Sequence, residues 1–291
     1  MKKINSKNKK YKILQLIFLM SIVMSFLVGC VGKTDDITVI SREDGSGTRG
    51  AFIELFGIEQ KGDNFRKDRT TKEAMVVKQT DMMMVSVAGD KNAIGYISLS
   101  SLNDTIKPVK VDGVSATSAN VKNGEYKVSR PFIIATKGDE SKIAKDFIDY
   151  ILSKEGQEIV GESYISVNDK APEYINHDNS GKVVVAGSSS VTPLMEKLKE
   201  GYLKLNPNVK IEIQQSDSST GLSGAISGTC DIAMSSRDLK EEEIKELKPI
   251  KIALDGIAII VNKENPVTDL SAKQIGNIFM GKITTWKDID K

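Results

Sequence analysis

Short runs of apolar and β-branched residues alternate along the chain with segments whose apolar residues recur every three or four positions. The runs 37–40, 183–186 and 210–214 have the composition of buried strands. In 142–153 the apolar residues repeat at helical spacing, and Ser141 is placed to cap the first turn. This alternation of strands and helices predicts an α/β fold with largely parallel sheets.

Each of these three strands runs into a loop rich in Ser, Thr and Gly, and each loop opens a predicted helix. The loops are 41–48, 187–192 and 216–221. Unpaired N–H groups and the positive end of the helix dipole make a helix N-terminus favourable for an anion. One such loop alone is also typical of an ordinary cap or turn. Three of them, following parallel strands, lie at the sheet edge where α/β folds bind ligands, so the pattern predicts an anion site.

The first thirty residues have the pattern of an export signal. Six lysines precede an apolar run over 13–28, which ends in Leu27-Val28-Gly29-Cys30. This ending resembles the lipobox of bacterial lipoproteins, whose chains are cut before the cysteine and carry a diacylglyceryl group on its thiol. The resemblance implies a signal peptide over 1–29, lipidation of Cys30 and a lipidated tether over 30–36, which hold the protein on the extracytoplasmic face of the cell membrane. The alternative is a retained membrane-spanning helix, since the run approaches the length that crosses a bilayer.

Composition places the chain among ordinary globular proteins. It has 291 residues, of which 40% are hydrophobic and 27% charged, enough for about two domains with substantial cores. The formal charge is +2, but six lysines and no acid lie in 1–29, which leaves 35 basic against 39 acidic residues. A net-negative protein is not expected to bind nucleic acid, and it must attract an anion through local donors.

Cysteine and histidine are too few for most catalytic or metal centres. The chain has two cysteines, Cys30 and Cys230, and one histidine, His177. With Cys30 lipidated no intrachain disulfide can form, and Cys230 is interpreted as a small buried residue. His177 lies in the polar connecting loop 176–181, so no nucleophile–base pair and no metal-ligand spacing appear. We therefore expect neither an enzyme nor a cofactor, with an exported phosphoester hydrolase as the alternative.

Three glycines match the spacing of the dinucleotide-binding fingerprint, but the rest of the fingerprint is not predicted. Gly45, Gly47 and Gly50 follow a strand and open a helix, as in G-x-G-x-x-G. That fingerprint also requires a second strand about twenty residues further on. The corresponding stretch, 61–69, is charged and is predicted not to be a strand, which disfavours the nucleotide interpretation.

Several longer motifs point to one family. They are 41–49, 93–99, 185–194 (VAGSSSVTPL), 230–237 (CDIAMSSR), 253–258 (ALDGIA) and 281–286 (GKITTW). Together they resemble the phosphate-binding proteins of bacterial phosphate ABC importers, and the resemblance covers essentially all of 37–291. It implies a two-lobed type II periplasmic-binding-protein fold, a solute-binding protein that captures inorganic phosphate, and delivery to the membrane permease of an importer. Molybdate or sulfate remains an alternative ligand.

The order of the segments departs from that family. Members normally begin with the segment resembling 182–291 and continue into the one resembling 37–175. We therefore predict a circular permutation, with the usual termini joined near 176–181 and the chain reopened after Trp286. One lobe is then expected over 130–250. The other is expected to combine 37–129 with 251–291. A monomer with both lobes from one chain is favoured over lobes exchanged between two chains.

The resemblance also implies a set of phosphate ligands and a role for two carboxylates. The implied ligands are Arg42, Ser46, Gly47, Thr48, Ser189, Ser190, Ser218 and Asp231. Asp44 is expected to orient Arg42 from within the same loop. Asp231 would accept the proton that phosphate carries near neutral pH and sulfate lacks, and would so discriminate between the two anions.

Overall fold

The computed structural model describes residues 35–62, 65–177 and 179–289. The predicted signal peptide and Cys30 lie outside these residues, and residues 37–291 form a unit of their own. In the described ranges, no helix is both long enough and apolar enough to cross a membrane.

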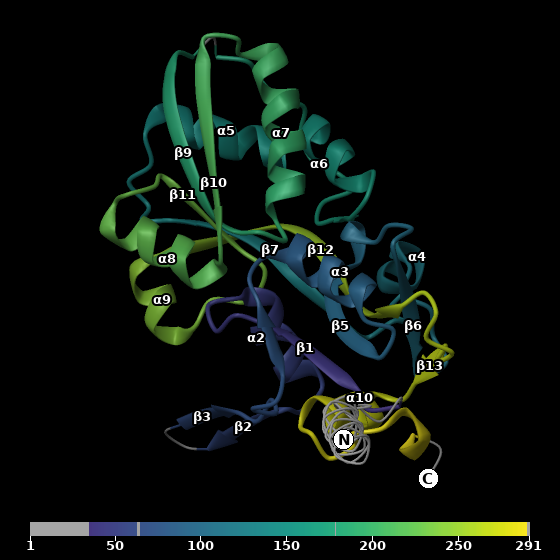
Figure 1. Cartoon of the computed structure of the whole chain (residues 1–291). Helices are drawn as coiled ribbons and strands as arrows, with labels where there is room; N and C mark the ends of the chain where they lie inside the picture. The colour runs from purple at the N-terminus through teal and green to yellow at the C-terminus, as the bar shows by residue number, and fades with distance from the viewer. Residues whose placement is uncertain (1–34, 63–64, 178, 290–291) are drawn as a thin grey trace, which may run out of the picture. The chain divides into compact units, whose positions relative to one another are not determined.

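Eleven strands of the described chain form one mixed sheet (Figure 1). They are β1 (Thr38–Arg42), β4 (Met75–Val77), β5 (Ala93–Ser98), β6 (Ile106–Val111), β7 (Ser129–Thr136), β8 (Ile165–Ser166), β9 (Gly181–Ser188), β10 (Val209–Ser216), β11 (Ile232–Ser235), β12 (Lys248–Asn262) and β13 (Asp269–Leu270). The order along the main path is β10-β9-β11-β7-β12-β5-β1-β4.

The helices follow the strands as the sequence pattern predicts. They are α2 (Gly47–Leu55), α3 (Thr80–Gly89), α4 (Ser118–Lys122), α5 (Lys142–Leu152), α6 (Lys154–Gly161), α7 (Thr192–Leu205), α8 (Ser218–Ser227), α9 (Glu241–Glu246) and α10 (Ala272–Phe279), with 3₁₀ turns η1 (Leu99–Ser101) and η2 (Trp286–Asp288). The helix expected over 142–153 is confirmed as α5, whose cap Ser141 accepts a hydrogen bond from the Ala144 amide. The three strand–loop–helix junctions are confirmed as β1–α2, β9–α7 and β10–α8.

Two long strands make the sheet mixed rather than largely parallel. The groups β10-β9-β11 and β5-β1-β4 are each internally parallel. Between them, β12 runs antiparallel to β7 over Lys248–Gly256 and antiparallel to β5 over Ile257–Val261. The register of β12 against β7 shifts between Lys251 and Ala253. One 15-residue strand therefore connects both parallel groups.

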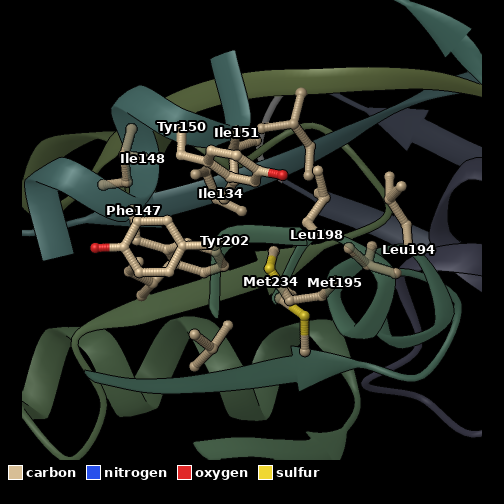
Figure 2. Close-up of a cluster of buried hydrophobic side chains, with 14 of the residues drawn as sticks. Ile134, Phe147, Ile148, Tyr150, Ile151, Leu194, Met195, Leu198, Tyr202 and Met234 are labelled. Carbon is tan, nitrogen blue, oxygen red and sulfur yellow. The ribbon is translucent and has the colours of Figure 1, made fainter. Parts of the chain in front are cut away.

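Alternate residues of the first parallel group pack on opposite faces of the sheet, as strand geometry requires. Val183 and Val185 of β9 contact the cluster formed with α5, α6 and α7, whereas Val184 and Ala186 pack with α8. Figure 2 shows the larger cluster, in which Tyr150, Tyr202 and Leu198 come from α5 and α7. Cys230 is buried and unpaired in the smaller cluster, which confirms its interpretation as a core residue.

The second group has the same two-sided arrangement. Ile257 and Ile259 of β12 face the cluster formed with α2 and α10, and Ala258 and Ile260 face the one formed with α3. The first pair of clusters draws on residues between 132 and 253, and the second on 39–128 and 257–279. The predicted lobe boundaries remain a prediction, and this division of the core favours them.

The charged stretch 61–69 differs from its prediction, because strands do form there. β2 (Glu59–Gly62) and β3 (Phe65–Asp68) pair as a separate antiparallel hairpin. Seven of the eight residues of this pair are partly or fully exposed polar groups or glycine, so no apolar alternation marks it in the sequence. The hairpin does not join the sheet, since β1 pairs with β4 and β5.

Gly221 offers a test of how closely α8 approaches β9. A Cβ atom at this position would lie 2.5 Å from Gly187 Cα and 2.6 Å from the Ala186 carbonyl oxygen. We expect Gly221→Ala to lower the free energy of unfolding by about 1–3 kcal/mol, because backbone must shift to admit the methyl group. Chemical denaturation measures this change.

The matched control is Gly161→Ala at the end of α6, where a Cβ atom would have no neighbour within 4 Å. This variant is expected to be as stable as the parent, or more stable by up to about 1 kcal/mol. Equal stabilities for the Gly221 and Gly161 variants would contradict the close approach.

Candidate functional site

The carboxyl ends of four strands converge on one group of polar side chains. β1 ends at Arg42, β9 at Ser188, β10 at Ser216 and β11 at Ser235, and the polar residues lie at these ends and in the turns that follow. Seven of the predicted site residues are brought together there. They are Arg42, Ser46, Gly47, Thr48, Ser189, Ser190 and Ser218.

Direct contacts join segments that are far apart in the sequence. Arg42 Nη2 donates to Ser189 Oγ at 3.1 Å, and Thr48 Oγ1 lies 2.8 Å from Ser190 Oγ. Ser46 caps α2 by accepting a hydrogen bond from the Arg49 amide. Arg42 is only 1% exposed, so its charge is almost entirely removed from bulk water.

Gly47 is required by the close approach of α2 to α8. A Cβ atom at Gly47 would lie 2.3 Å from Ser218 Oγ and 2.7 Å from Ser236 Oγ. The same approach is supported by a backbone hydrogen bond from the Ser219 amide to the Gly45 carbonyl at 3.2 Å. The N-termini of the two helices therefore meet at the site, where both dipoles favour a negative charge.

Glu43, rather than Asp44, orients the Arg42 guanidinium. Glu43 accepts from Arg42 Nε and Nη2, both at 2.8 Å. The Asp44 carboxylate is 96% exposed and accepts from Arg49 Nη1 at 2.5 Å. The expected role of Asp44 is therefore wrong. The chain turns after Glu43, whose carbonyl accepts from the Ser46 amide, and this turn directs the Asp44 side chain outward to Arg49.

Asp231 does not belong to the cluster. Its exposed side chain accepts a hydrogen bond from the Val184 amide at 2.7 Å. It immediately precedes β11, whose first residue Ile232 pairs with Val185, whereas the cluster lies beyond the last residue of that strand. Its implied ligand role is therefore corrected: the residue lies at the wrong end of the strand to reach the anion site.

Ser236 and Thr80 are site residues that the sequence analysis missed. Ser236 Oγ accepts a hydrogen bond from Ser188 Oγ at 2.9 Å, and its amide donates to Ser218 Oγ at 3.1 Å. Ser236 follows the end of β11, so the signal used for the other three strands could have found it. Thr80 Oγ1 lies 3.4 Å from Ser190 Oγ and 3.5 Å from Arg42 Nη1. It begins α3, and no local motif marks it.

Tyr96 holds the end of β1 in place beneath the site residues, through hydrogen bonds of its hydroxyl group with Ser41 and Arg42. Its hydroxyl accepts from the Arg42 amide at 3.1 Å and lies 2.9 Å from Ser41 Oγ. Burial raises the pKa of Tyr96, so its hydroxyl keeps its proton at physiological pH. The ring stacks on Phe52 of α2 with centroids 3.9 Å apart, which fixes both the end of β1 and the helix that follows it.

A buried ion pair lies where β7 and β12 cross between the two parallel groups. Arg130 Nη2 lies 3.3 Å from Asp255 Oδ2, and Asp255 Oδ1 accepts from Ser98 Oγ at 2.9 Å. Burial raises the pKa of Asp255 to about 6 and lowers that of Arg130 to about 10, so both are charged at neutral pH. Arg130 also lines a cleft of about 790 Å³, together with Ser46, Arg49 and Ser219.

The site is suited to a tetrahedral oxyanion. It offers one guanidinium, helix N-termini and a shell of hydroxyl groups. The hydroxyls come from Ser46, Thr48, Thr80, Ser188, Ser189, Ser190, Ser218 and Ser236. Hydroxyls and guanidinium donors match the oxygens of such an anion. Among the residues that the structure describes, no group of three or more His, Cys, Asp or Glu could hold a metal ion.

Comparison with known proteins identifies the class. A family model described as PBP superfamily domain matches residues 31–155 and 173–291. The chain belongs to this superfamily and has its two-lobed α/β fold. The predicted circular permutation is not addressed by these matches and stays a prediction.

Individual relatives match over most of their length. The chain is 51% identical to "Phosphate-binding protein PstS 2" of Streptococcus agalactiae serotype V, over 97% of this chain and 100% of the relative. It is 45% identical to the protein of the same name from Streptococcus pneumoniae serotype 4, over 87% of each chain. The crystal structure of a phosphate ABC transporter phosphate-binding protein from S. pneumoniae TIGR4 superposes with a TM-score of 0.70, at 45% identity, over 87% of this chain and 99% of that one.

The raised pKa of Asp255 predicts an unusual pH dependence of stability. Its value of about 6 exceeds the usual value near 4, so the folded chain binds more protons than the unfolded chain between these values. The contribution of Asp255 to stability is therefore fully present below about pH 4 and is lost as pH rises through about 6. Relative to Asp255→Asn, the parent should lose up to about 3 kcal/mol over this interval.

Urea denaturation of both proteins at about pH 4 to 7.5 measures the difference, because the titrating groups that do not contact Asp255 are shared and cancel. A stability difference that does not change with pH would contradict the assignment.

Proposed function

We propose that the chain is an extracytoplasmic solute-binding protein that captures inorganic phosphate and delivers it to the permease of an ABC importer. The observation that carries the proposal is the buried Arg42 guanidinium, held by Glu43 and surrounded by hydroxyls from four strand ends. The names of the relatives and of the matching crystal structure support phosphate as the ligand.

Phosphate binding would combine one strong ionic contact with several neutral ones. Hydrogen bonds to charged groups contribute about 1.5–3 kcal/mol each, so Arg42 would supply a large share of the affinity. A hydroxyl can donate or accept, and it can therefore also accept a hydrogen bond from the P–OH group of monoprotonated phosphate. Because Asp231 is elsewhere and Glu43 is engaged with Arg42, hydroxyls would perform the recognition that was expected of a carboxylate.

The division of the buried core supports lobes over 130–250 and over 37–129 with 251–291, in one chain whose segments are circularly permuted. Arg42 and Ser189, from different lobes, contact each other within this chain, which favours a monomer with a complete site. Lobes of this kind close around their ligand by a hinge motion. Lipidation of Cys30 would hold the protein at the outer face of the cell membrane.

The alternative functions receive less support from the described residues. His177 is half exposed, and its Nε2 lies 3.9 Å from Oδ1 of Asp146, a residue outside the site. Nucleophile–base chemistry for a phosphoester hydrolase is therefore not assembled around Arg42. Sulfate or molybdate would satisfy the same donors, and a direct titration separates these anions from phosphate.

Replacement of Arg42 tests the proposed site. Arg42→Met should weaken phosphate binding by at least about 100-fold, because the charged hydrogen bonds are lost from a buried site. Calorimetric titration of the parent and variant with phosphate, sulfate and molybdate measures the effect.

The matched control is Arg69→Met, since Arg69 is an exposed arginine whose described contacts are the backbone carbonyls of Gly57 and Ile58. It should bind phosphate as the parent does. Tighter binding of sulfate or molybdate than of phosphate by the parent, or unchanged binding by Arg42→Met, would contradict the proposal.

Substitutions of Ser236 and Asp231 are expected to have different effects on phosphate affinity. Ser236→Ala should weaken phosphate binding by roughly tenfold, since one buried hydroxyl contributes about 1–1.5 kcal/mol. Asp231→Asn should leave both the affinity and the preference over sulfate within about twofold, because its described partner is a backbone amide remote from the site. Parallel titrations check both, and loss of the sulfate discrimination in Asp231→Asn would restore the ligand role that the structure removes.

A further inference from the structure

Arg130 is a fully buried cation that does not belong to the anion site yet contacts one of its loops. It lies near the start of β7, is 2% exposed, and donates from Nη1 to the backbone carbonyl of Ser236 at 3.1 Å. Its Nε and Nη2 face Asp255 Oδ2 at 3.4 and 3.3 Å. These contacts use three of the five guanidinium N–H groups and tie Arg130 to the Ser236 backbone and to Asp255 of β12.

These contacts connect three segments that are distant in the sequence. Ser236 follows β11, Asp255 lies in β12, and Asp255 accepts in turn from Ser98 at the end of β5. β11 packs in the first parallel group and β5 in the second, so Arg130 lies between the two. The guanidinium also lies 5.4 Å from the centroid of the Phe132 ring, which restricts its position further.

Ser236, which Arg130 holds through its carbonyl, is hydrogen-bonded to two hydroxyls of the anion site. Its amide donates to Ser218 Oγ, and its hydroxyl accepts from Ser188 Oγ. Ser218 and Ser236 are also the two side chains that a Cβ atom at Gly47 would meet. A displacement of the Ser236 backbone would therefore move two hydroxyls and the surface against which Gly47 packs.

A contribution to folding stability does not explain the buried Arg130–Asp255 ion pair. Desolvation of two buried charges offsets most of their attraction, and well-packed apolar replacements are often as stable or more stable. An arginine differs from an apolar residue in its fixed fork of donors, which can hold several acceptors in one geometry. Here the acceptors are the Ser236 carbonyl and the Asp255 carboxylate.

We propose that Arg130 is a positioning residue for the anion site: it fixes the Ser236 loop against β12 and the end of β5, and so sets the geometry in which the site hydroxyls meet the anion. This inference rests on the proposed function. It predicts that loss of Arg130 weakens binding even where the fold is fully stable.

The decisive variant is the double replacement Arg130→Met with Asp255→Leu, which removes both charges together and leaves no unpaired ion. Its melting temperature without phosphate should equal or exceed that of the parent. Its phosphate dissociation constant should nevertheless rise at least tenfold, mainly through faster dissociation, because the complex is less well ordered while diffusional encounter is unchanged. Calorimetry and stopped-flow measurements give the constant and both rates.

Arg130→Lys is the second variant, since lysine keeps the charge but lacks the fork that reaches two acceptors. It should lose affinity to a similar extent as the double variant. Parent-like affinity in the stable double variant, or full recovery with lysine, would overturn the positioning role. Failure of the parent itself to bind phosphate would instead overturn the proposed function, so the two failures are distinguishable.

Discussion

The burial of the Arg42 guanidinium is the constraint on which the site depends. A buried cation requires acceptors, and Glu43 supplies two carboxylate oxygens from the neighbouring position while Ser189 supplies a hydroxyl from across the site. The remaining structure holds this arrangement in place. Tyr96 fixes the Arg42 backbone amide, Arg49 bonds its carbonyl, and the end of β1 is thereby held from both sides. Glu43 neutralises much of the charge of the Arg42 guanidinium. An anion would therefore meet N–H donors held in a fixed orientation rather than an isolated positive charge.

The sequence predicted those parts of the fold and site that depend on local order. Strand ends followed by hydroxyl-rich loops placed three loops at one edge of the sheet, because the helix that follows each loop fixes where its first residues lie. The family resemblance then selected Thr48, Ser189, Ser190 and Ser218 from these loops. Thr80 reaches the site because β4 pairs with β1 and α3 begins just after β4. The pairing of β4 with β1 joins segments that are far apart in the sequence, so it cannot be predicted from a short stretch of residues. The same is true of the antiparallel pairing of β12.

The errors at Asp44 and Asp231 have one physical origin. A motif carries residue types, but a side chain's position depends on which end of a strand it occupies and how the following turn is closed. Asp231 is one residue before β11 and Ser236 one residue after it, so the two lie at opposite ends of the same four-residue strand. Likewise, adjacent carboxylates at Glu43 and Asp44 point to different arginines, and only the turn after Glu43 decides which one orients Arg42.

The continuity of β12 has an entropic consequence for ligand capture. The two parallel groups belong to one chain and are connected by β12, which pairs with β7 on one side and with β5 on the other, so bringing their residues together is an intramolecular step. An intramolecular step avoids the translational and rotational entropy that two separate molecules lose when they associate. The two parallel groups therefore face each other at a high effective concentration. The register shift between Lys251 and Ala253 lies within this connection. Under the proposed function, phosphate would order only a bend in two strands, so more of the free energy of its contacts would remain available as affinity.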